Sequence, residues 1–406
     1  MNSNRAIIAL MLVLAAPGAV LRFSGIHVGT LPDTALFGLS IVAAAFLLGW
    51  AAEAAEMDIT QGLAVAFVAL IAVMPEYAVS MAFAWKAGVD PAYEPYAVAN
   101  MTGGNRLLIG AAWPMLVLLV WWRTGAKALV LERSFAIEVL TLAVISIYAF
   151  TIPIKGHIDL FDAVVLFLGF VAYMWMIARA PSEEPELVGP ARLIGALPRL
   201  QRRIVLAALF VYAAVAILTS AEPFAEGLIH TGLQFGINEF ILVQWLAPFA
   251  SEAPEFLVAG ILAYRGRASV GMGALLSSKV NQWTLLVGGL PIAYSLSKGG
   301  LHVLPLDVRQ NEEMLLTAAQ SIFAVAVVLS LSLSLREALM LFGLFAVTFV
   351  VPSTEVRLAA AFVYLGLTVI IVVMQRAELP AIWRSARETL AETNAAVADR
   401  HAAPRE

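Results

Sequence analysis

Two acidic residues stand out because each lies inside a long apolar stretch and directly follows a proline. Glu76 follows Pro75 and Glu255 follows Pro254, and Pro, Glu, Val and Ala recur between the two copies at a constant offset of 179 residues. A carboxylate at the centre of a bilayer costs roughly 2.5–3.5 kcal/mol on insertion scales, so two of them need a reason. Each proline removes a backbone hydrogen bond, and freed carbonyl oxygens suit hard cations. These residues predict that Glu76 and Glu255 face each other and share a cation.

The position of each proline places the two glutamates at a similar depth. Each apolar stretch ends in an aromatic-basic pair, Trp85-Lys86 or Tyr264-Arg265, and the proline lies about ten residues earlier, or ~15 Å along a helix. Half of the ~30 Å hydrocarbon core of a bilayer is the same distance. Both carboxylates are therefore predicted to lie near the midplane.

Composition requires that the elements carrying these residues lie in a membrane. Of 406 residues, 61% are hydrophobic and 13% charged, with a mean hydropathy of +0.87, whereas a soluble domain is ~25% charged. The chain has no cysteine and a net charge of −4, which exclude disulfides, thiolate metal sites and a nucleic-acid-binding surface. The histidines form no metal or catalytic pattern, and no nucleotide-binding loop is present. We expect neither an enzyme nor a bound cofactor.

Hydropathy predicts an all-α membrane protein with about twelve transmembrane helices. The predicted segments are 6–21, 35–56, 60–85, 95–122, 134–150, 160–179, 204–222, 237–264, 268–296, 314–333, 335–351 and 354–375. The first segment has an alternative interpretation, because Arg5 and the run Ala15-Ala16-Pro17-Gly18-Ala19 also resemble a cleaved signal peptide.

Basic residues distribute unevenly when the loops are assigned alternately to two faces. One face receives 17 lysines and arginines and the other receives 6, while Arg106 and Lys279 lie inside predicted spans. Since Lys and Arg collect on the cytoplasmic side, the bias predicts a multi-pass protein of the cell membrane with both termini in the cytoplasm.

The twelve segments divide into two units with a connection between them. Segments two to six form a first repeat and segments seven to eleven a second, and an odd number of spans per unit inverts the second relative to the first. Inverted repeats with charges at the midplane are typical of secondary transporters. The predicted parts are an extra N-terminal helix and loop (1–34), the first repeat (35–180), a cytoplasmic linker (181–203), the second repeat (204–351), an extra C-terminal helix (352–375) and a cytoplasmic tail (376–406).

Polar residues in and beside the following spans supply further candidate ligands. Asn100 and Asn105 flank a Gly-Gly pair where a span should be apolar, and amide oxygens are neutral cation ligands. Ser277 and Ser278 occupy the comparable place in the second repeat, where packing through small residues is the alternative. Upstream of Glu255, Glu252 adds a third acid near the same helical face, and Ser251 adds a hydroxyl.

The Pro-Glu pair on one helix, followed by Asn-x-x-Gly-x-Asn on the next and repeated in inverse orientation, resembles the cation/calcium antiporter superfamily of sodium/calcium and calcium/proton exchangers. The motifs cover about 60–115 and 237–291. The resemblance implies a ten-helix core of two inverted five-helix repeats. It further implies that Glu76 and Glu255 are the central ion-binding carboxylates and that Asn100 is the amide ligand beside them.

The sequence departs from the family pattern Gly-Thr-Ser-x-Pro-Glu, whose hydroxyls help to bind sodium. The first copy, Ile71-Ala72-Val73-Met74-Pro75-Glu76, lacks both hydroxyls, and Ala274 stands where the second repeat commonly has Asp or Asn. The buried cations Arg106 and Lys279 lower the negative charge of the site and are candidate charge-coupling residues.

Three interpretations remain open. The first is an antiporter that exchanges Ca²⁺ or another inorganic cation for H⁺ or Na⁺ across the lipid bilayer by alternating access. The second is a Na⁺/H⁺ exchanger of the same fold, which is favoured if Arg106 and Lys279 each hold one carboxylate. The third is a non-transporting membrane protein whose site is plugged by those two cations.

Overall fold

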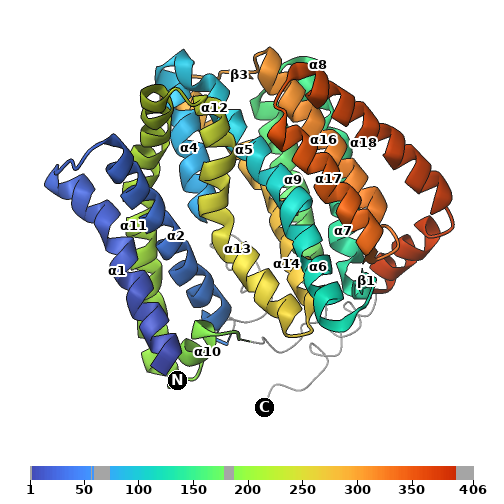
Figure 1. Cartoon of the computed structure of the whole chain (residues 1–406), viewed down its shortest axis with the longest axis horizontal. Coiled ribbons are helices and arrows are strands. Elements are labelled where there is room, and N and C mark those ends of the chain that lie inside the picture. Colours follow the sequence, from blue (N-terminus) through green and yellow to red (C-terminus); the bar gives the residue numbers. More distant parts are fainter. Residues whose placement is uncertain (1, 56, 59–73, 178–186, 390–406) are drawn as a thin grey trace, which may run out of the picture.

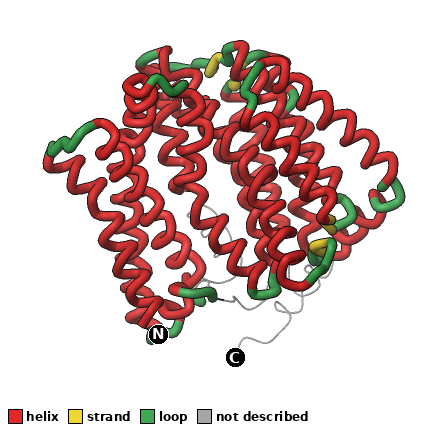
Figure 2. The backbone as a smooth tube through the Cα atoms, viewed as in Figure 1, coloured by secondary structure: helices red, strands yellow, loops and turns green. Residues whose placement is uncertain are grey.

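Apolar helices run back and forth between two faces of one bundle in the computed structural model (Figures 1 and 2). The structure describes residues 2–55, 57–58, 74–177 and 187–389. Within these residues, eight helices are long and apolar enough to cross a membrane. Helical residues are present at all twelve predicted segments, and the third segment is described only from residue 74 onward. The predicted all-helical membrane fold is confirmed.

The first half of the chain contains the following elements in order. They are α1 (Asn2–Ser24), α2 (Thr30–Ala55), α4 (Met74–Val89), η1 (Pro91–Tyr93), α5 (Glu94–Leu107), η2 (Leu108–Ala112), α6 (Trp113–Thr124), β1 (Ala128–Val130), η3 (Arg133–Phe135), α7 (Ala136–Ala149), α8 (Thr151–Lys155), β2 (His157–Ile158) and α9 (Leu160–Ile177).

The second half begins after the predicted linker, of which residues 187–203 are described. It contains α10 (Pro190–Gly195), α11 (Arg199–Phe235), α12 (Glu239–Ile241), η4 (Leu242–Leu246), α13 (Ala247–Tyr264), α14 (Ala268–Asn281), η5 (Gln282–Leu286), α15 (Val287–Lys298), β3 (Leu304–Pro305), α16 (Val308–Val328), β4 (Ser332–Ser334), α17 (Leu335–Val350) and α18 (Thr354–Met374). Residues 379–389 form a further short helix, in the part of the chain predicted to be a tail.

Side chains are distributed as expected for a protein surrounded by lipid. Large apolar residues such as Val144 on α7, Leu168 on α9 and Val369 on α18 are exposed on the outside of the bundle. Carboxylates and basic groups, by contrast, are buried inside it. Because water favours the opposite distribution, these helices are suited to a bilayer.

Two short strand pairs connect the halves of the bundle in a symmetric way. β1 pairs antiparallel with β4, and β2 pairs antiparallel with β3. In each repeat one strand follows the third helical element and the other follows the fourth, so each pair joins a strand of one repeat to a strand of the other. The π-helical turns η2 and η5 also lie at equivalent points, between α5 and α6 and between α14 and α15. These features agree with the two-repeat layout.

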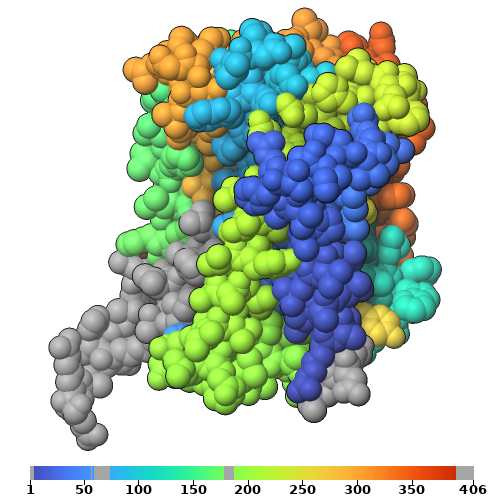
Figure 3. All heavy atoms as spheres, turned by 90° about the vertical axis from the view of Figure 1, so that its left-hand side faces the viewer, coloured from blue at the N-terminus to red at the C-terminus, as the bar shows by residue number. Residues whose placement is uncertain are grey.

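The first helices of the two predicted repeats, α2 and α11, pack along each other at one side of the bundle, with α1 beside them (Figures 1 and 3). The backbone N–H of Gly18 in α1 donates to Ser40 Oγ of α2 at 2.8 Å, and the Tyr212 hydroxyl of α11 donates to the Leu12 carbonyl at 2.6 Å. α1 therefore packs as a member of the bundle.

α11 is longer than the predicted segment 204–222, since it continues to Phe235 with Pro223 inside it. Hydropathy ended the segment early because Glu222 and Glu226 are charged. In the folded chain two basic residues balance their charge: Arg22 of α1 lies 2.9 Å from Glu222, and Lys86 of α4 lies 3.0 Å from Glu222 and also binds Glu226. Pairing between distant segments makes the extension possible.

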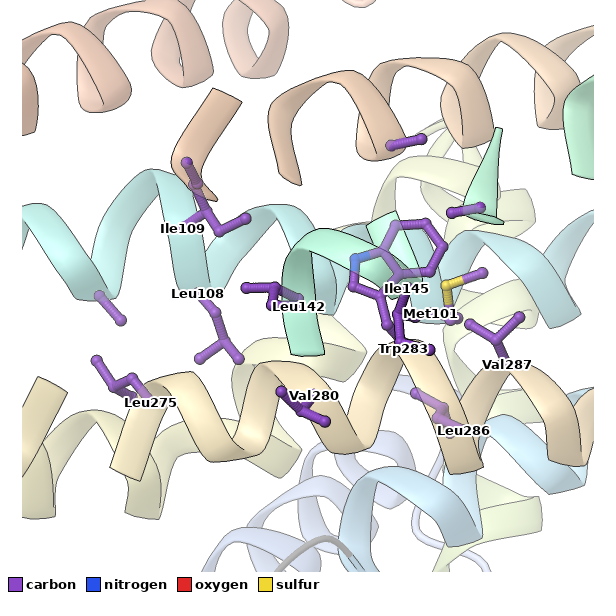
Figure 4. Close-up of a cluster of buried hydrophobic side chains, with 14 of the residues drawn as sticks. Met101, Leu108, Ile109, Leu142, Ile145, Leu275, Val280, Trp283, Leu286 and Val287 are labelled. Carbon is purple, nitrogen blue, oxygen red and sulfur yellow. The ribbon is translucent and has the colours of Figure 1, made fainter. Parts of the chain in front are cut away.

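An apolar core holds α5, α7 and α14 together. Figure 4 shows Val280 and Trp283 of α14 and η5 close to Leu142 and Ile145 of α7. The Trp283 indole N–H donates to Ser321 Oγ of α16 at 2.9 Å, so even the polar atom of this ring is satisfied. This packing fixes the two helices that carry the predicted polar ligands.

α1 begins and α18 ends at the same face of the bundle, which also carries α10 and β1 (Figure 1). We call this the basic face, because the loops assigned the larger number of lysines and arginines lie there. α8 and β3 lie at the opposite face (Figure 1). The bundle therefore has the even number of spans that the charge bias predicts.

Candidate cation-binding site

Glu76 lies in the first turn of the described part of α4, and its side chain is buried within the bundle. A second buried carboxylate, Glu252 of α13, lies beside it. The amide nitrogen of Gln282 connects them, since Nε2 donates to Glu252 Oε1 at 2.6 Å and to Glu76 Oε2 at 3.1 Å. Three segments that are distant in sequence therefore place two carboxylates around one amide group.

The Gly-Gly pair of α5 explains how the carboxylates come so close to the helix backbone. A Cβ atom at Gly104 would lie 2.5 Å from Glu252 Oε1 and 3.0 Å from Glu76 Oε1. A Cβ at Gly103 would lie 1.6 Å from the Gln244 carbonyl oxygen of η4. Any larger residue would push α5 away from η4 and α13, so the glycines are needed for close approach.

Several buried oxygen atoms around this point have no hydrogen-bond partner. They are Glu76 Oε1, Glu252 Oε2, Gln282 Oε1 and Asn100 Oδ1. Buried polar atoms are normally paired, so unpaired acceptors from four helical segments indicate a place for a missing donor or cation. Carboxylate and amide oxygens are the ligands that hard cations take.

Acidic groups alone do not complete a metal site. Among the described residues, no three Asp, Glu, His or Cys side chains lie close enough together to hold a metal ion. A cation bound here would therefore also need amide oxygens, backbone oxygens or water.

Asn100 lies fully buried on α5, and its amide nitrogen donates to Ser80 Oγ of α4 at 2.5 Å. This bond leaves Oδ1 without a partner. The predicted role of Asn100 as an amide ligand remains compatible with this orientation.

Glu255 is half-buried, and its Oε2 has no partner. Gln282 joins Glu76 to Glu252, one helical turn before Glu255, so Glu252 is the acid that shares an amide donor with Glu76. A cation shared by Glu76 and Glu255 stays a prediction. Glu255 still lies close enough to repel both carboxylates electrostatically.

The helix that carries Glu255 is continuous at its proline. α13 continues through Pro254, and the irregular π-helical turn of this segment lies upstream at η4. The Ser251 hydroxyl donates within the helix, to the carbonyls of Ala247 and Pro248 at 3.2 Å. Ser251 is thus buried near the site, and its hydroxyl proton is already used in a hydrogen bond to the helix backbone.

Lys279 is fully buried, but it does not hold a carboxylate. Its ammonium donates to the backbone oxygen of Asn105 at 2.7 Å and to Asn105 Oδ1 at 2.6 Å. It also lies over the Trp283 ring, 5.5 Å from the centroid. Asn105 Oδ1 is therefore occupied by Lys279, which removes Asn105 from the set of free ligand oxygens.

Arg106 turns away from the site toward α16 and α17. Its guanidinium forms a buried ion pair with Glu313 and donates to Thr348 Oγ1 at 2.7 Å. The Trp245 ring lies 5.0 Å from the guanidinium carbon. A plugged site predicts ion pairs between these two cations and Glu76 or Glu255. Among the described residues, neither Arg106 nor Lys279 forms such a pair.

The two serines of α14, Ser277 and Ser278, have different surroundings. Ser277 Oγ accepts a hydrogen bond from the Tyr173 hydroxyl of α9 at 2.9 Å, while Ser278 is buried. Ser277 thus belongs to a contact with α9 and not to the carboxylate pair.

Sequence reasoning missed two residues that matter here, Gln282 and Glu313. Gln282 lies in the polar run of α14 and η5, but a neutral amide gave no reason to single it out. Glu313 lies just before the predicted span 314–333, so it was assigned to a loop. A search for acids near span ends that could neutralise Arg106 would have found it.

Comparisons with known proteins identify the family and agree with the fold. Residues 34–179 and 205–375 match the model of the family described as sodium/calcium exchanger protein. No curated protein matches the chain.

Solved structures resemble the whole bundle. The H⁺/Ca²⁺ exchanger CAX is 43% identical, with a TM-score of 0.92 over 96% of this chain and 99% of that one. Native YfkE is 16% identical, with a TM-score of 0.62 over 87% of this chain and 99% of that one. A structure of the sodium–calcium exchanger NCX_Mj is 18% identical, with a TM-score of 0.52 over 78% of this chain and 96% of that one. The last two likenesses show the fold alone.

Family match, fold and buried carboxylates lead to one conclusion: the chain belongs to the sodium/calcium exchanger family, within the cation/calcium antiporter superfamily.

Proposed function

We propose that this protein is a secondary antiporter, and not an enzyme, that exchanges Ca²⁺ for H⁺ by alternating access at the site formed by Glu76 and Glu252. The observation that carries the proposal is the pair of buried carboxylates around Gln282, with unpaired oxygens beside them. Glu255 and Asn100 complete the proposed set of ligands.

Charge supports a divalent cargo. Arg106 is neutralised by Glu313, so it does not count toward the site. Glu76, Glu252 and Glu255 together with a protonated Lys279 leave two net negative charges, which match one Ca²⁺ or two protons. Because desolvation disfavours a bare buried carboxylate, each acid is expected to bind either a proton or the cation.

The similarity to the H⁺/Ca²⁺ exchanger CAX, at 43% identity, supports the same pair of ions. Na⁺/H⁺ exchange is the second candidate, because the first Pro-Glu copy lacks the hydroxyls of the family pattern and Lys279 lowers the charge near the site. The asymmetry of basic residues supports placement in the cell membrane with both termini in the cytoplasm.

The test is Ca²⁺ uptake into sealed proteoliposomes under an imposed pH gradient, with Na⁺, K⁺ and Mn²⁺ added in separate trials. E76Q and E252Q are each expected to reduce uptake at least about tenfold, since each removes a charge from the site. E255Q is expected to have a smaller effect, because Glu255 lies outside the Gln282 bridge. E378Q, a change of an exposed glutamate after α18, is the control.

Proton flux that depends on Ca²⁺ and is lost in E76Q and E252Q supports the proposal. Flux with Na⁺ alone favours the second candidate. Folded protein that moves none of these cations contradicts both and favours a non-transporting role.

A further inference from the structure

A cavity with an apolar lining opens on the outside of the bundle. It has a volume of about 450 Å³ and lies between α7, α9 and the helix at 379–389. Its lining residues on α7 and α9 are apolar except for Thr141. Val144 of α7 is 65% exposed and Trp383 of the 379–389 helix is 66% exposed, so the cavity is accessible from outside. Because the outside of these helices is suited to lipid, the cavity is open to the hydrocarbon of the bilayer.

The length of the cavity matches one leaflet of a bilayer. On α7 its lining extends from Ile137, the second residue of the helix, to Ile145, which is ~12 Å further along the axis. On α9 it extends from Gly169 to Met176, next to the last residue of that helix. α7 begins and α9 ends at the basic face, and half of the hydrocarbon core is ~15 Å thick. The cavity therefore runs from the basic face toward the midplane, as an acyl chain of that leaflet does.

The 379–389 helix closes the end of the cavity at the basic face. Ile382 and Ala386 are buried in the apolar core, while Trp383 and Arg387, four residues apart on the same side of the helix, line the cavity. Tryptophan is enriched where hydrocarbon meets the headgroups of a bilayer. The arginine guanidinium binds phosphate oxygens with two parallel N–H groups. An apolar cavity with these two residues at its end has the chemistry that a phospholipid requires.

Arg387 is available to bind an anion. Its side chain is exposed, and within residues 187–389 and the other described ranges it forms no ion pair. No acidic residue lines its cavity, whereas the neighbouring cavity that Arg384 lines also contains Glu378 and Glu388. The positive charge beside the apolar cavity is therefore complementary to a phosphate group, while the positive charge of Arg384 lies among acids.

The adjoining segments of this chain are too polar to fill the cavity. Residues 178–186 follow α9, and residues 390–406 follow the helix at its end. By sequence, Leu390 and Val397 are the only large apolar residues of these two segments, which contain several charged residues. Burying such charges in an apolar cavity is costly. An acyl chain of the surrounding bilayer carries no such cost.

We propose that this cavity is a binding site for a membrane phospholipid, with one acyl chain between α7 and α9 and the phosphate at Arg387. The site is distinct from the cation site and goes beyond the proposed function. Ile145 lines the cavity and also lies close to Trp283 of η5 (Figure 4). A bound chain therefore supports the packing of α7 against the segment that carries Gln282 and Lys279.

Native mass spectrometry of the full chain in detergent tests the site, with phosphatidylglycerol as the probe. The wild type is expected to bind one molecule more tightly than the others. Ala172→Phe fills the cavity from an exposed position on α9 and should weaken this binding about tenfold or more. Val171→Phe is the matched control, because Val171 is also exposed and does not line the cavity. It should leave the binding unchanged.

Arg387→Gln tests the phosphate contact separately. It should weaken phosphatidylglycerol binding about tenfold, because charge-assisted hydrogen bonds to the phosphate are lost. Binding of diacylglycerol with the same acyl chains, which lacks the phosphate, should be the same in R387Q and the wild type. Arg384→Gln is the control on the same helix, and it should change neither affinity.

Thermal unfolding of delipidated protein gives a second measure of the same site. Added phosphatidylglycerol should raise the unfolding temperature of the wild type and of V171F more than that of A172F and R387Q, since a ligand stabilises the state that it binds. R387Q changes an exposed side chain, so its result decides the matter even where A172F is too unstable to compare.

Two results would overturn the proposal. One is phosphatidylglycerol binding that neither A172F nor R387Q weakens, or no tight binding by the wild type. The other is a dimer of the wild type that A172F dissociates, because the cavity would then belong to an interface between two copies of this chain. None of these measurements depends on which cation the protein transports.

Discussion

The two helices that carry buried basic residues, α5 and α14, use them in different ways. Arg106 of α5 binds the carboxylate of Glu313, whereas Lys279 of α14 binds the neutral oxygens of Asn105. The first arrangement is a closed ion pair, while the second leaves a positive group within electrostatic reach of Glu76 and Glu252. Basic residues at comparable places in the two repeats therefore need not be neutralised in the same way, because each side chain binds the partner that it can reach.

The same two helices differ in their small residues. α5 carries Gly103-Gly104 where the comparable polar run of α14 carries Ser277-Ser278. The glycines allow η4 and the two site carboxylates to contact the α5 backbone, while Ser277 binds a hydroxyl of α9. α5 thus lines the cation site with its backbone, whereas Ser277 of α14 contacts a helix on another side.

The largest effect is expected from Arg106→Met, which leaves the buried Glu313 with only Arg357, whose Nε lies 3.8 Å from Glu313 Oε1 and whose guanidinium also binds Glu312. Breaking a buried ion pair in this way costs roughly 3–5 kcal/mol, so the thermal unfolding temperature in detergent should fall sharply. The double variant R106M/E313Q should recover most of the loss. A single variant as stable as the wild type would show that the pair is not desolvated.

Gly103→Ala should destabilise the protein more than Ser277→Ala does. The new methyl group would lie 1.6 Å from the Gln244 carbonyl oxygen, and the required backbone shift costs about 1–3 kcal/mol or more. Ser277→Ala removes one hydrogen bond, worth about 1 kcal/mol. Unfolding temperatures of the two variants test the difference, and equal values would contradict the close contact.

Gly104→Ala should impair cation binding more than folding. Its methyl group would lie 2.5 Å from Glu252 Oε1, which is the end of a flexible side chain and can move. Displacing that carboxylate should weaken Ca²⁺ affinity about tenfold, or ~1.4 kcal/mol. Calorimetric titration of Ca²⁺ measures this, with Gly366→Ala on α18 as the control, because a Cβ there would meet nothing within 4 Å. Unchanged affinity in G104A would show that the cation does not bind beside Gly104.

Lys279→Met should strengthen Ca²⁺ binding several-fold, because it removes a positive charge near Glu76 and Glu252. The same change should slow transport, since a more strongly bound ion leaves more slowly. Titration and proteoliposome uptake provide the two measurements. Weaker binding in K279M would show that the ammonium organises the site instead of opposing the cation.

The smallest effect is expected at the basic face, where Asp58 accepts a hydrogen bond from Arg202 at 2.6 Å and lies 3.3 Å from Arg203. The Arg202 hydrogen bond holds the pKa of Asp58 below its usual value. This stability is present above the unfolded pKa of about 4 and is lost as pH falls through the folded pKa. Asp58→Asn should therefore lower the neutral-pH unfolding temperature slightly and flatten its decline in acid. An unchanged acid profile would exclude this contribution.

Much of the fold was predictable because it depends on local composition. The predicted spans followed from apolar runs, and the repeat followed from the recurrence of Pro75-Glu76 as Pro254-Glu255. Hydropathy does not predict the end of α11, because Glu222 and Glu226 are charged in their own segment and are balanced only by Arg22 and Lys86 from other helices. Charges that are paired across the bundle cannot be recognised from their own segment.

The site was predictable only in part for the same reason. Sequence spacing singled out Glu76, Glu252 and Asn100, which the structure brings to one region. It did not predict that Gln282 would connect the two acids, that Asn105 would be occupied by Lys279, or that Arg106 would pair with Glu313.

By itself, then, the sequence determined that the chain lies in a membrane as two related sets of helices with acids inside their apolar segments. These properties depend on hydrophobicity and periodicity, which each segment carries alone. Only the tertiary structure decided which acid meets which base and which oxygens stay unpaired. A side chain of about 6 Å reaches partners on several neighbouring helices, and packing alone selects among them.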